Sequence, residues 1–168
     1  GVEWQLARGF PWHVAFTSFR ALQANEETVL RRPILRVGFT RLRSFARLAD
    51  WPGLASIREL DLSRSNLGDD GVRRLVTPPH LGSLTRLDLR ASAITPAGVE
   101  ALAGSPALAG LTPLNLSGNP SLGAAGVRTL ASSPHLSRLV ALALTHCEIR
   151  DEGLAALIRS PHLTALRD

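Results

Sequence analysis

The sequence contains no methionine, no lysine and one cysteine, and its aromatic residues stop at Trp51. Cys147 has no partner for an internal disulfide, so nothing favours an oxidising compartment and we expect a cytoplasmic location. No apolar run approaches the roughly 18 residues that a membrane-spanning helix needs, which argues against membrane insertion. The length of 168 residues, 45% of them hydrophobic, predicts one folded domain.

Positive charge comes from arginine alone. The chain has 19 basic and 14 acidic residues, a net charge of +5 and an isoelectric point of about 11.3. Guanidinium groups bind carboxylates and phosphates well, so acidic proteins and nucleic acids are both candidate partners. A GC-rich coding sequence, which favours arginine and alanine codons, explains the same composition without any partner.

One segment recurs along the chain. Copies that begin with leucine start at residues 54, 81, 108, 136 and 163, so successive starts lie 27, 27, 28 and 27 residues apart. The extra residue of the third copy falls in a loop around Pro120 and Ser121, where an insertion does least harm. A fixed period of this length is typical of solenoid proteins, in which each repeat packs only against its neighbours.

Each full copy follows the pattern L-x-x-L-x-L-x-x-N/C-x-L, with serine also used at the polar position. The matching residues are Ile57, Leu60, Leu62, Ser65 and Leu67; Leu84, Leu87, Leu89, Ser92 and Ile94; Leu111, Leu114, Leu116, Asn119 and Leu122; and Leu139, Leu142, Leu144, Cys147 and Ile149. This pattern resembles the leucine-rich repeat family, in the longer helix-containing form of ribonuclease-inhibitor-like proteins. The resemblance implies an α/β fold, a solenoid with a parallel β-sheet on the concave face and helices on the convex face. Curvature follows because parallel strands lie about 4.8 Å apart, whereas packed helices need about 8–10 Å.

The second half of each copy predicts a helix. Thr95 and Pro96 are typical of a helix start, as are the acidic pairs at 69–70 and 151–152. Where the helix backbone packs closely we expect the recurring glycines, Gly71, Gly98, Gly126 and Gly153. Pairs three residues apart predict the buried stripe: Val72 and Leu75, Val99 and Leu102, Val127 and Leu130, and Leu154 and Leu157. Each helix is then stopped by a proline, namely Pro79, Pro106, Pro134 and Pro161.

The two ends differ from the middle. Residues 1–33 read as an aromatic-rich cap and 34–53 as a degenerate repeat; full repeats span 54–80, 81–107, 108–135 and 136–162; and 163–168 begin a truncated fifth. In the cap we expect a strand over 12–18 and a helix over 19–30, capped by Thr17 or Ser18. Its aromatic residues should be core rather than a ligand cage, namely Trp4, Trp12, Phe16 and Phe19. The cap is also similar to the segment that precedes the repeats in uncharacterised bacterial proteins carrying an upstream companion domain.

The truncated fifth copy stops before its main strand. Either the chain is a fragment, or the flank around Leu139, Leu142 and Leu144 is covered by another chain, for example by homo-association.

Several groups suggest metal or catalytic chemistry, and the repeat explains each of them. Asp69 and Asp70 lie in a loop rich in oxygen side chains that could bind calcium, but other copies replace them with Pro96-Ala97 and Ala124-Ala125. His80, His135 and His162 occupy the same turn of three repeats, with Ala107 in the second, so they would form a line. Zinc needs three or four converging ligands instead. Cys147 holds the polar position of the repeat and should face inward, away from its neighbour His146. We therefore expect no cofactor, no metal and no catalytic activity.

The concave face is the predicted binding surface. Its outward-facing residues form a mixed-charge patch: Arg36, Glu59, Asp61, Arg64, Arg86, Asp88, Arg90 and Asn115. Neighbours such as Asp61 and Arg86 could simply neutralise each other, or the patch could set specificity for a protein partner. We favour a non-catalytic protein–protein interaction module that binds a polypeptide.

Two other functions stay open. Binding of nucleic acid or another polyanion is disfavoured because the helical arginines lie scattered among acidic residues, with no aromatic stacking platform: Arg73, Arg74, Arg128 and Arg159. The chain could also be a structural spacer or cap within a larger protein.

Overall fold

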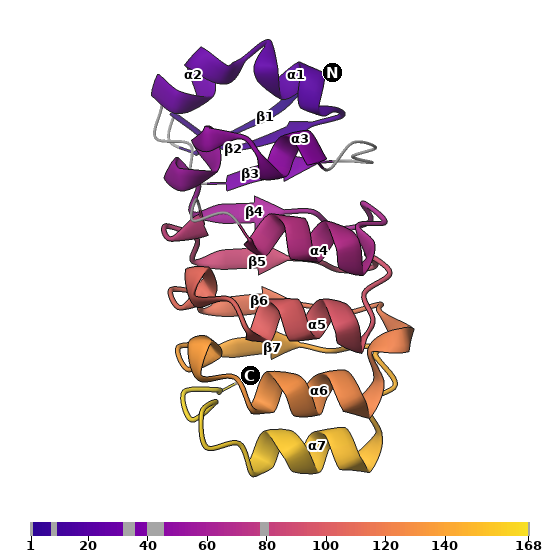
Figure 1. The fold of residues 1–168 in the computed structure, drawn as a ribbon. Helices are drawn as coiled ribbons and strands as arrows, with labels where there is room; N and C mark the ends of the chain where they lie inside the picture. The colour runs from indigo at the N-terminus through magenta and orange to yellow at the C-terminus, as the bar shows by residue number, and fades with distance from the viewer. Residues whose placement is uncertain (1, 8–9, 32–35, 40–45, 78–80, 168) are drawn as a thin grey trace.

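The chain forms a row of coils, each of which adds a strand to one sheet and a helix to a layer behind it (Figure 1). The computed structural model describes residues 2–7, 10–31, 36–39, 46–77 and 81–167. The strands are β1 (Val2–Ala7), β2 (Phe10–Phe16), β3 (Arg36–Phe39), β4 (Glu59–Asp61), β5 (Arg86–Asp88), β6 (Pro113–Asn115) and β7 (Ala141–Ala143). The helices are α1 (Phe19–Gln23), α2 (Glu26–Arg31), α3 (Ala46–Ala49), α4 (Gly68–Val76), α5 (Pro96–Ala103), α6 (Gly123–Ala131) and α7 (Arg150–Ile158). Short 3-10 turns also occur: η1 (Pro52–Ser56), η3 (Pro106–Leu108), η4 (Pro120–Leu122) and η5 (Pro134–Leu136).

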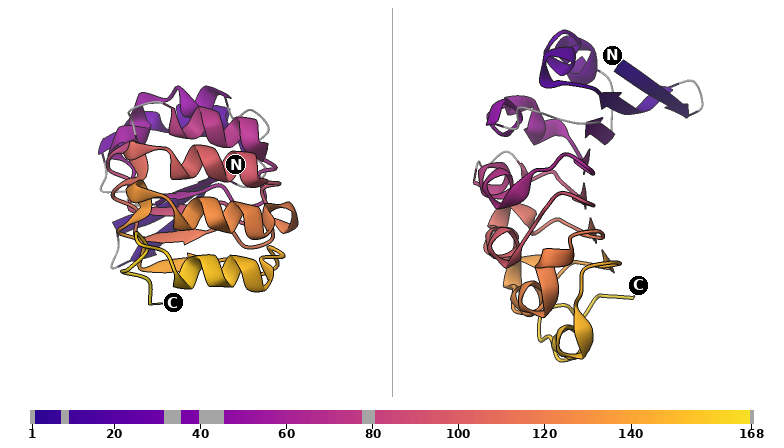
Figure 2. Two further views of the ribbon diagram at one scale, coloured as in Figure 1. Left: turned by 60° about the horizontal axis from the view of Figure 1, so that its bottom comes forward. Right: turned by 90° about the vertical axis from the view of Figure 1, so that its right-hand side faces the viewer.

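The sheet follows chain order, and each strand from β2 to β6 pairs in parallel with the next. Equivalent residues of successive coils are aligned, as where Leu60 pairs with Leu87 and Leu87 with Leu114. Seen from the side, the strands follow an arc with the helices on its outer side (Figure 2). The prediction of a curved α/β solenoid is therefore confirmed.

A continuous aliphatic core runs through the coils. Leu62, Leu89 and Leu116 are fully buried, and each donates its backbone N–H to the following coil. Burial of a leucine side chain contributes about 1.5–3 kcal/mol, so these rows supply much of the driving force for stacking. Leu144 holds the same position in the last coil but is only half-buried.

The polar position of the repeat lies inside the core and binds loop backbone. Asn119 is fully buried, and its Oδ1 accepts the N–H groups of Ser92 and Ile94, both at 3.0 Å. Its Nδ2 donates to the carbonyls of Leu89 and Leu116. Cys147 holds this position in the next coil, where its Sγ lies 3.0 Å from the Leu116 carbonyl. Burial raises the pKa of the Cys147 thiol, against N–H groups of Asn119 and Gly118 that lower it.

The glycines inside the helices allow close packing, as predicted. A Cβ on Gly126 would lie 2.8 Å from the Leu122 side chain, the residue that ends the loop of the same coil. A Cβ on Gly98 would overlap the Asp69 carboxylate of the preceding coil. Both positions therefore need a residue without a side chain.

The N-terminal cap contains one strand more than predicted. β1 pairs antiparallel with β2, and this hairpin extends the sheet at its N-terminal end. The predicted single helix is two, because the chain turns at Asn25, whose Nδ2 donates to the Ala21 carbonyl. Ser18 caps α1, since its hydroxyl accepts the Ala21 N–H. Phe16 and Phe19 are buried as expected, while the side chains of Trp4 and Trp12 lie outside those that the structure describes.

The predicted buried stripe holds only in part in the last helix. Val72, Val99 and Val127 are buried, but of the predicted pair in α7 Leu157 is only partly buried against the core and Leu154 is 51% exposed. Ile158, outside the predicted stripe, is 76% exposed. Within the described residues no helix follows α7, so no residue among them forms a further layer over it. The truncated copy shields only the turn region: Leu163 is buried, and the Arg167 N–H donates to the Val140 carbonyl at 2.9 Å.

Candidate functional site on the concave face

The strand register aligns the outward-facing residues into two rows. One row runs across β2, β3, β4 and β5 through His13, Arg36, Glu59 and Arg86. The other runs from β3 to β7 through Gly38, Asp61, Asp88, Asn115 and Ala143. Six of the eight predicted site residues therefore share one continuous surface, while Arg64 and Arg90 lie in the loops that follow β4 and β5.

The ion pairs of this face differ from the predicted pairing. Arg36 Nη2 lies 2.7 Å from Asp61 Oδ2, and Arg86 Nε lies 3.2 Å from Glu59 Oε2. The predicted pair of Asp61 with Arg86 is wrong, because the register places Arg86 directly opposite Glu59. Gly38 lies opposite Asp61 and has no side chain, which leaves room for Arg36 to reach Asp61 diagonally.

Three polar residues of the second row also bind their own loops. Asp61, Asp88 and Asn115 each accept, at 3.0 Å through Oδ1, the backbone N–H of the residue two positions later. Burial alone would raise the pKa of Asp61, but the Ser63 hydroxyl, the Ser63 N–H and Arg36 together hold it below its usual value. These side chains turn the chain at the end of each strand, so their role is at least partly structural.

His13 belongs to the face, although the sequence did not predict it. It lies opposite Arg36 in the register, and a Cβ on Gly38 would be 3.1 Å from His13 Nε2. Burial, followed by the positive charge of Arg36, lowers the pKa of His13, so the neutral imidazole is favoured. The signal that could have found it is an alignment of the two strands, in which His13 and Ala15 match Arg36 and Gly38.

A hollow of about 340 Å³ lies on this face. Its lining consists of Arg36, Arg86, Leu87, Asp88, Pro113, Leu114, Asn115, Ala141 and Ala143. Charged residues come from β3 and β5, and small or uncharged residues come from β6 and β7. The sequence predicted the charged part of this site but not Pro113, Ala141 and Ala143. These uncharged residues become part of a site only because the fold places them next to the arginines.

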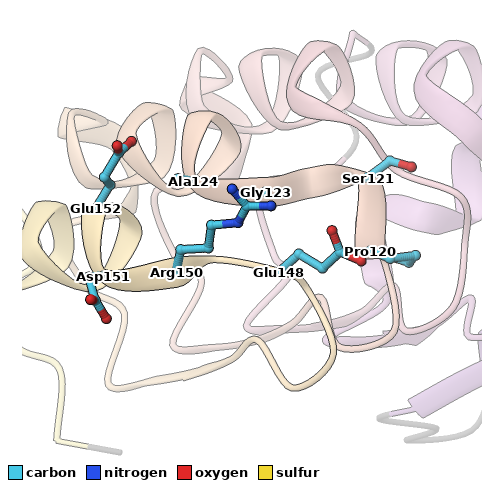
Figure 3. Close-up of a pocket in the computed structure, with 8 residues that line it drawn as sticks. All are labelled: Pro120, Ser121, Gly123, Ala124, Glu148, Arg150, Asp151 and Glu152. Carbon is cyan, nitrogen blue, oxygen red and sulfur yellow. The ribbon is translucent and has the colours of Figure 1, made fainter.

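A second hollow, of about 550 Å³, lies at the start of α6 and α7 (Figure 3). It follows from the extra residue of the third coil, since Pro120 and Ser121 form one wall. Asp151 and Glu152 point in opposite directions, and Glu152 contacts Arg128 at 3.2 Å. These two carboxylates therefore do not form one binding site.

The candidates for metal binding or catalysis do not assemble. Within the described part of the chain, no group of three histidine, cysteine, aspartate or glutamate residues is placed to hold a metal ion. His135 and His162 lie in successive turns, and His80 is outside the described residues. Cys147 is buried whereas His146 is exposed, so they do not form a nucleophile pair. None of the described helices is long and apolar enough to cross a bilayer.

Comparison with known proteins identifies the repeats. A family model described as Leucine Rich repeat matches residues 53–76, 80–103, 111–131 and 135–157, more than half of the chain. No curated protein matches the chain.

Proposed function

Because this chain belongs to the leucine-rich repeat family, we propose that it is a non-catalytic interaction module that binds a polypeptide on its concave face. Proteins of this family are commonly protein-interaction modules and are generally non-catalytic. Membership of a family is an argument by analogy, so the proposal depends on the site itself.

The hollow of the concave face is the observation that carries the proposal. It combines Arg36, Arg86 and Asp88 with the small residues Ala141 and Ala143 on one continuous sheet. Small residues let a partner backbone approach the sheet closely, and the neighbouring charges can fix its register and orientation.

The helical face supports a polyanion site less well. Arg73 contacts Asp70 at 2.9 Å, and Arg128 contacts Glu152 at 3.2 Å. These pairs leave a surface of mixed charge rather than one basic stripe. All eight aromatic residues of the chain lie at or before Trp51, so the later coils have none on which bases could stack.

Site-specific photocrosslinking tests the proposal. A photoreactive phenylalanine analogue is incorporated at Ala143, which is exposed on the concave β7, or at Ala125, which is exposed on the convex α6. Both versions are irradiated in a lysate of the cells that produce the protein. We expect discrete crosslinked polypeptides from position 143 and none, or only a diffuse background, from position 125.

The unmodified chain serves as competitor, and it should suppress the crosslinks at position 143. Equal crosslinking from both positions, or crosslinks that the competitor does not reduce, would show that the concave face is not the docking surface.

A further inference from the structure

On the premise that the concave face binds a polypeptide, its carboxylates have little capacity left for a partner. Asp61 uses one oxygen for the Ser63 N–H and the other for Arg36. Asp88 accepts the Arg90 N–H at 3.0 Å, and its Oδ2 lies 3.5 Å from Asn115 Nδ2. Only 19% of the Asp61 side chain and 15% of the Asp88 side chain are exposed. The acidic groups of the face are therefore largely used by the protein itself.

Arg36 is taken up by its contact with Asp61, but within the described residues Arg86 and Arg90 keep free donors. Arg86 contacts Glu59 only through Nε, so its two Nη groups have no acceptor within the described part of the chain. Arg90 lies 3.7 Å from Asp88, which is longer than a hydrogen bond, and 46% of its side chain is exposed. A guanidinium carries five N–H donors and no acceptor. Both arginine side chains are about half exposed, so their spare donors are open to a partner that supplies acceptors.

The hollow places Arg86 beside an uncharged part of the sheet, and Arg90 follows in the loop after β5. Arg86 and Asp88 line it on the β5 side, while Pro113, Ala141 and Ala143 line it from β6 and β7. The described positions of β6 and β7 on this face carry no charge, so nothing there pairs with a basic partner residue.

We infer that the partner presents an acidic polypeptide segment, with carboxylates bound by Arg86 and by Arg90 and small or apolar residues over Ala141 and Ala143. An arginine–carboxylate pair can form two parallel hydrogen bonds, which gives directional selectivity as well as attraction. A single-stranded nucleic acid fits less well, because the described residues of β4 to β7 offer no aromatic side chain on which bases could stack.

Peptide selection distinguishes this inference from the proposed function on which it rests. The immobilised chain is used to select from a random dodecapeptide library displayed on phage, and bound peptides are then measured by fluorescence anisotropy. We expect selected peptides to be enriched in aspartate and glutamate and to bind more weakly at high salt. The double variant Arg86→Ala/Arg90→Ala should weaken their binding at least about tenfold.

The matched control is Arg73→Ala/Arg74→Ala, which removes the same charge from exposed positions of α4 on the convex side. This variant should change the affinity less than about twofold. The selected peptides could instead lack acidic residues and yet bind less well to an Ala143→Arg variant. That result would overturn the acidic partner but support the concave face as the docking surface.

Two other outcomes would contradict the polypeptide-binding concave face, and not only the acidic character of the partner. No enriched peptide, or binding insensitive to both Arg86→Ala/Arg90→Ala and Ala143→Arg, would overturn the concave site itself. Tight binding of fluorescent single-stranded oligothymidine that depends on Arg86 and Arg90, without selection of acidic peptides, would point to a polyanion instead.

Discussion

At the scale of single residues, Asn119 makes four buried side-chain hydrogen bonds. One side chain bonds two N–H groups and two carbonyls, which belong to the loop or strand ends of two coils. Buried backbone groups need partners, and these loop groups have no strand or helix to supply them. Ser92 meets the same need less fully, with its hydroxyl donating to the Leu62 and Arg90 carbonyls.

Replacing Asn119 should therefore destabilise the whole array. We expect Asn119→Ala to lower the free energy of unfolding by about 3 kcal/mol or more, because it leaves several buried polar groups without partners. Asn119→Ser should cost less, since serine already serves this position at Ser92. Urea denaturation followed by circular dichroism measures both, and a loss below about 1 kcal/mol for Asn119→Ala would contradict this role.

At the scale of helices and strands, neighbouring coils are joined by a cap. The Asp69 carboxylate lies in the first turn of α4, but it accepts the backbone N–H of Thr95 at 2.9 Å and the Thr95 hydroxyl at 2.6 Å. Thr95 in turn caps α5 by accepting the Ala97 N–H. The acidic residue that resembled part of a calcium loop thus anchors the start of the next helix.

Asp69 and Asp151 occupy equivalent positions, so they form a matched pair. We expect Asp69→Ala to lower the free energy of unfolding by about 1–2 kcal/mol, because the Thr95 N–H and hydroxyl lose their acceptor. Asp151 is exposed, and Asp151→Ala should change stability by less than about 0.5 kcal/mol. Thermal unfolding of the two variants in parallel checks this, and equal losses would show that the cap is not the cause.

At the scale of the whole molecule, the C-terminal flank is open. Leu62, Leu89 and Leu116 donate their N–H groups to the next coil, but the equivalent Leu144 N–H has no acceptor among the described residues. Leu154 and Ile158 are exposed on α7, which begins at Arg150, carries Asp151 and Glu152 in its first turn and is followed by Arg159. A two-fold axis that runs from the sheet layer to the helix layer would bring both layers of a second copy into contact. It would also place the acidic start of one α7 near Arg159 of the other.

We therefore expect the chain to associate with a second copy through α7. Light scattering at increasing concentration should show a dimer for the wild type and a monomer for Leu154→Glu/Ile158→Glu. Ala125→Glu, an equally charged change at an exposed position of α6, should leave the dimer intact. A wild-type chain that is monomeric and stable at every concentration would rule out this association.

Much of the fold follows from residues that lie within one coil. The period near 27 residues, the alternating leucines, the polar position of Asn119 and the helix starts are local patterns, and each was predicted correctly from them. Repetition strengthens these predictions, because an error in one copy is corrected by its neighbours. The degenerate N-terminal cap has no such copies, so its first strand and the break at Asn25 were missed.

The site depends instead on contacts between coils. Arg36 and Asp61 are 25 residues apart, and Asp69 and Thr95 are 26 apart, so no local pattern encodes either pair. Strand register and the curvature of the stacked layers decide which side chains have spare hydrogen-bonding capacity. They also decide where small residues leave a hollow. Composition and period establish that the chain has an inner sheet surface. Three-dimensional packing decides that Asp61 and Asp88 are used by the protein itself, while among the described residues Arg86 and Arg90 keep free donors.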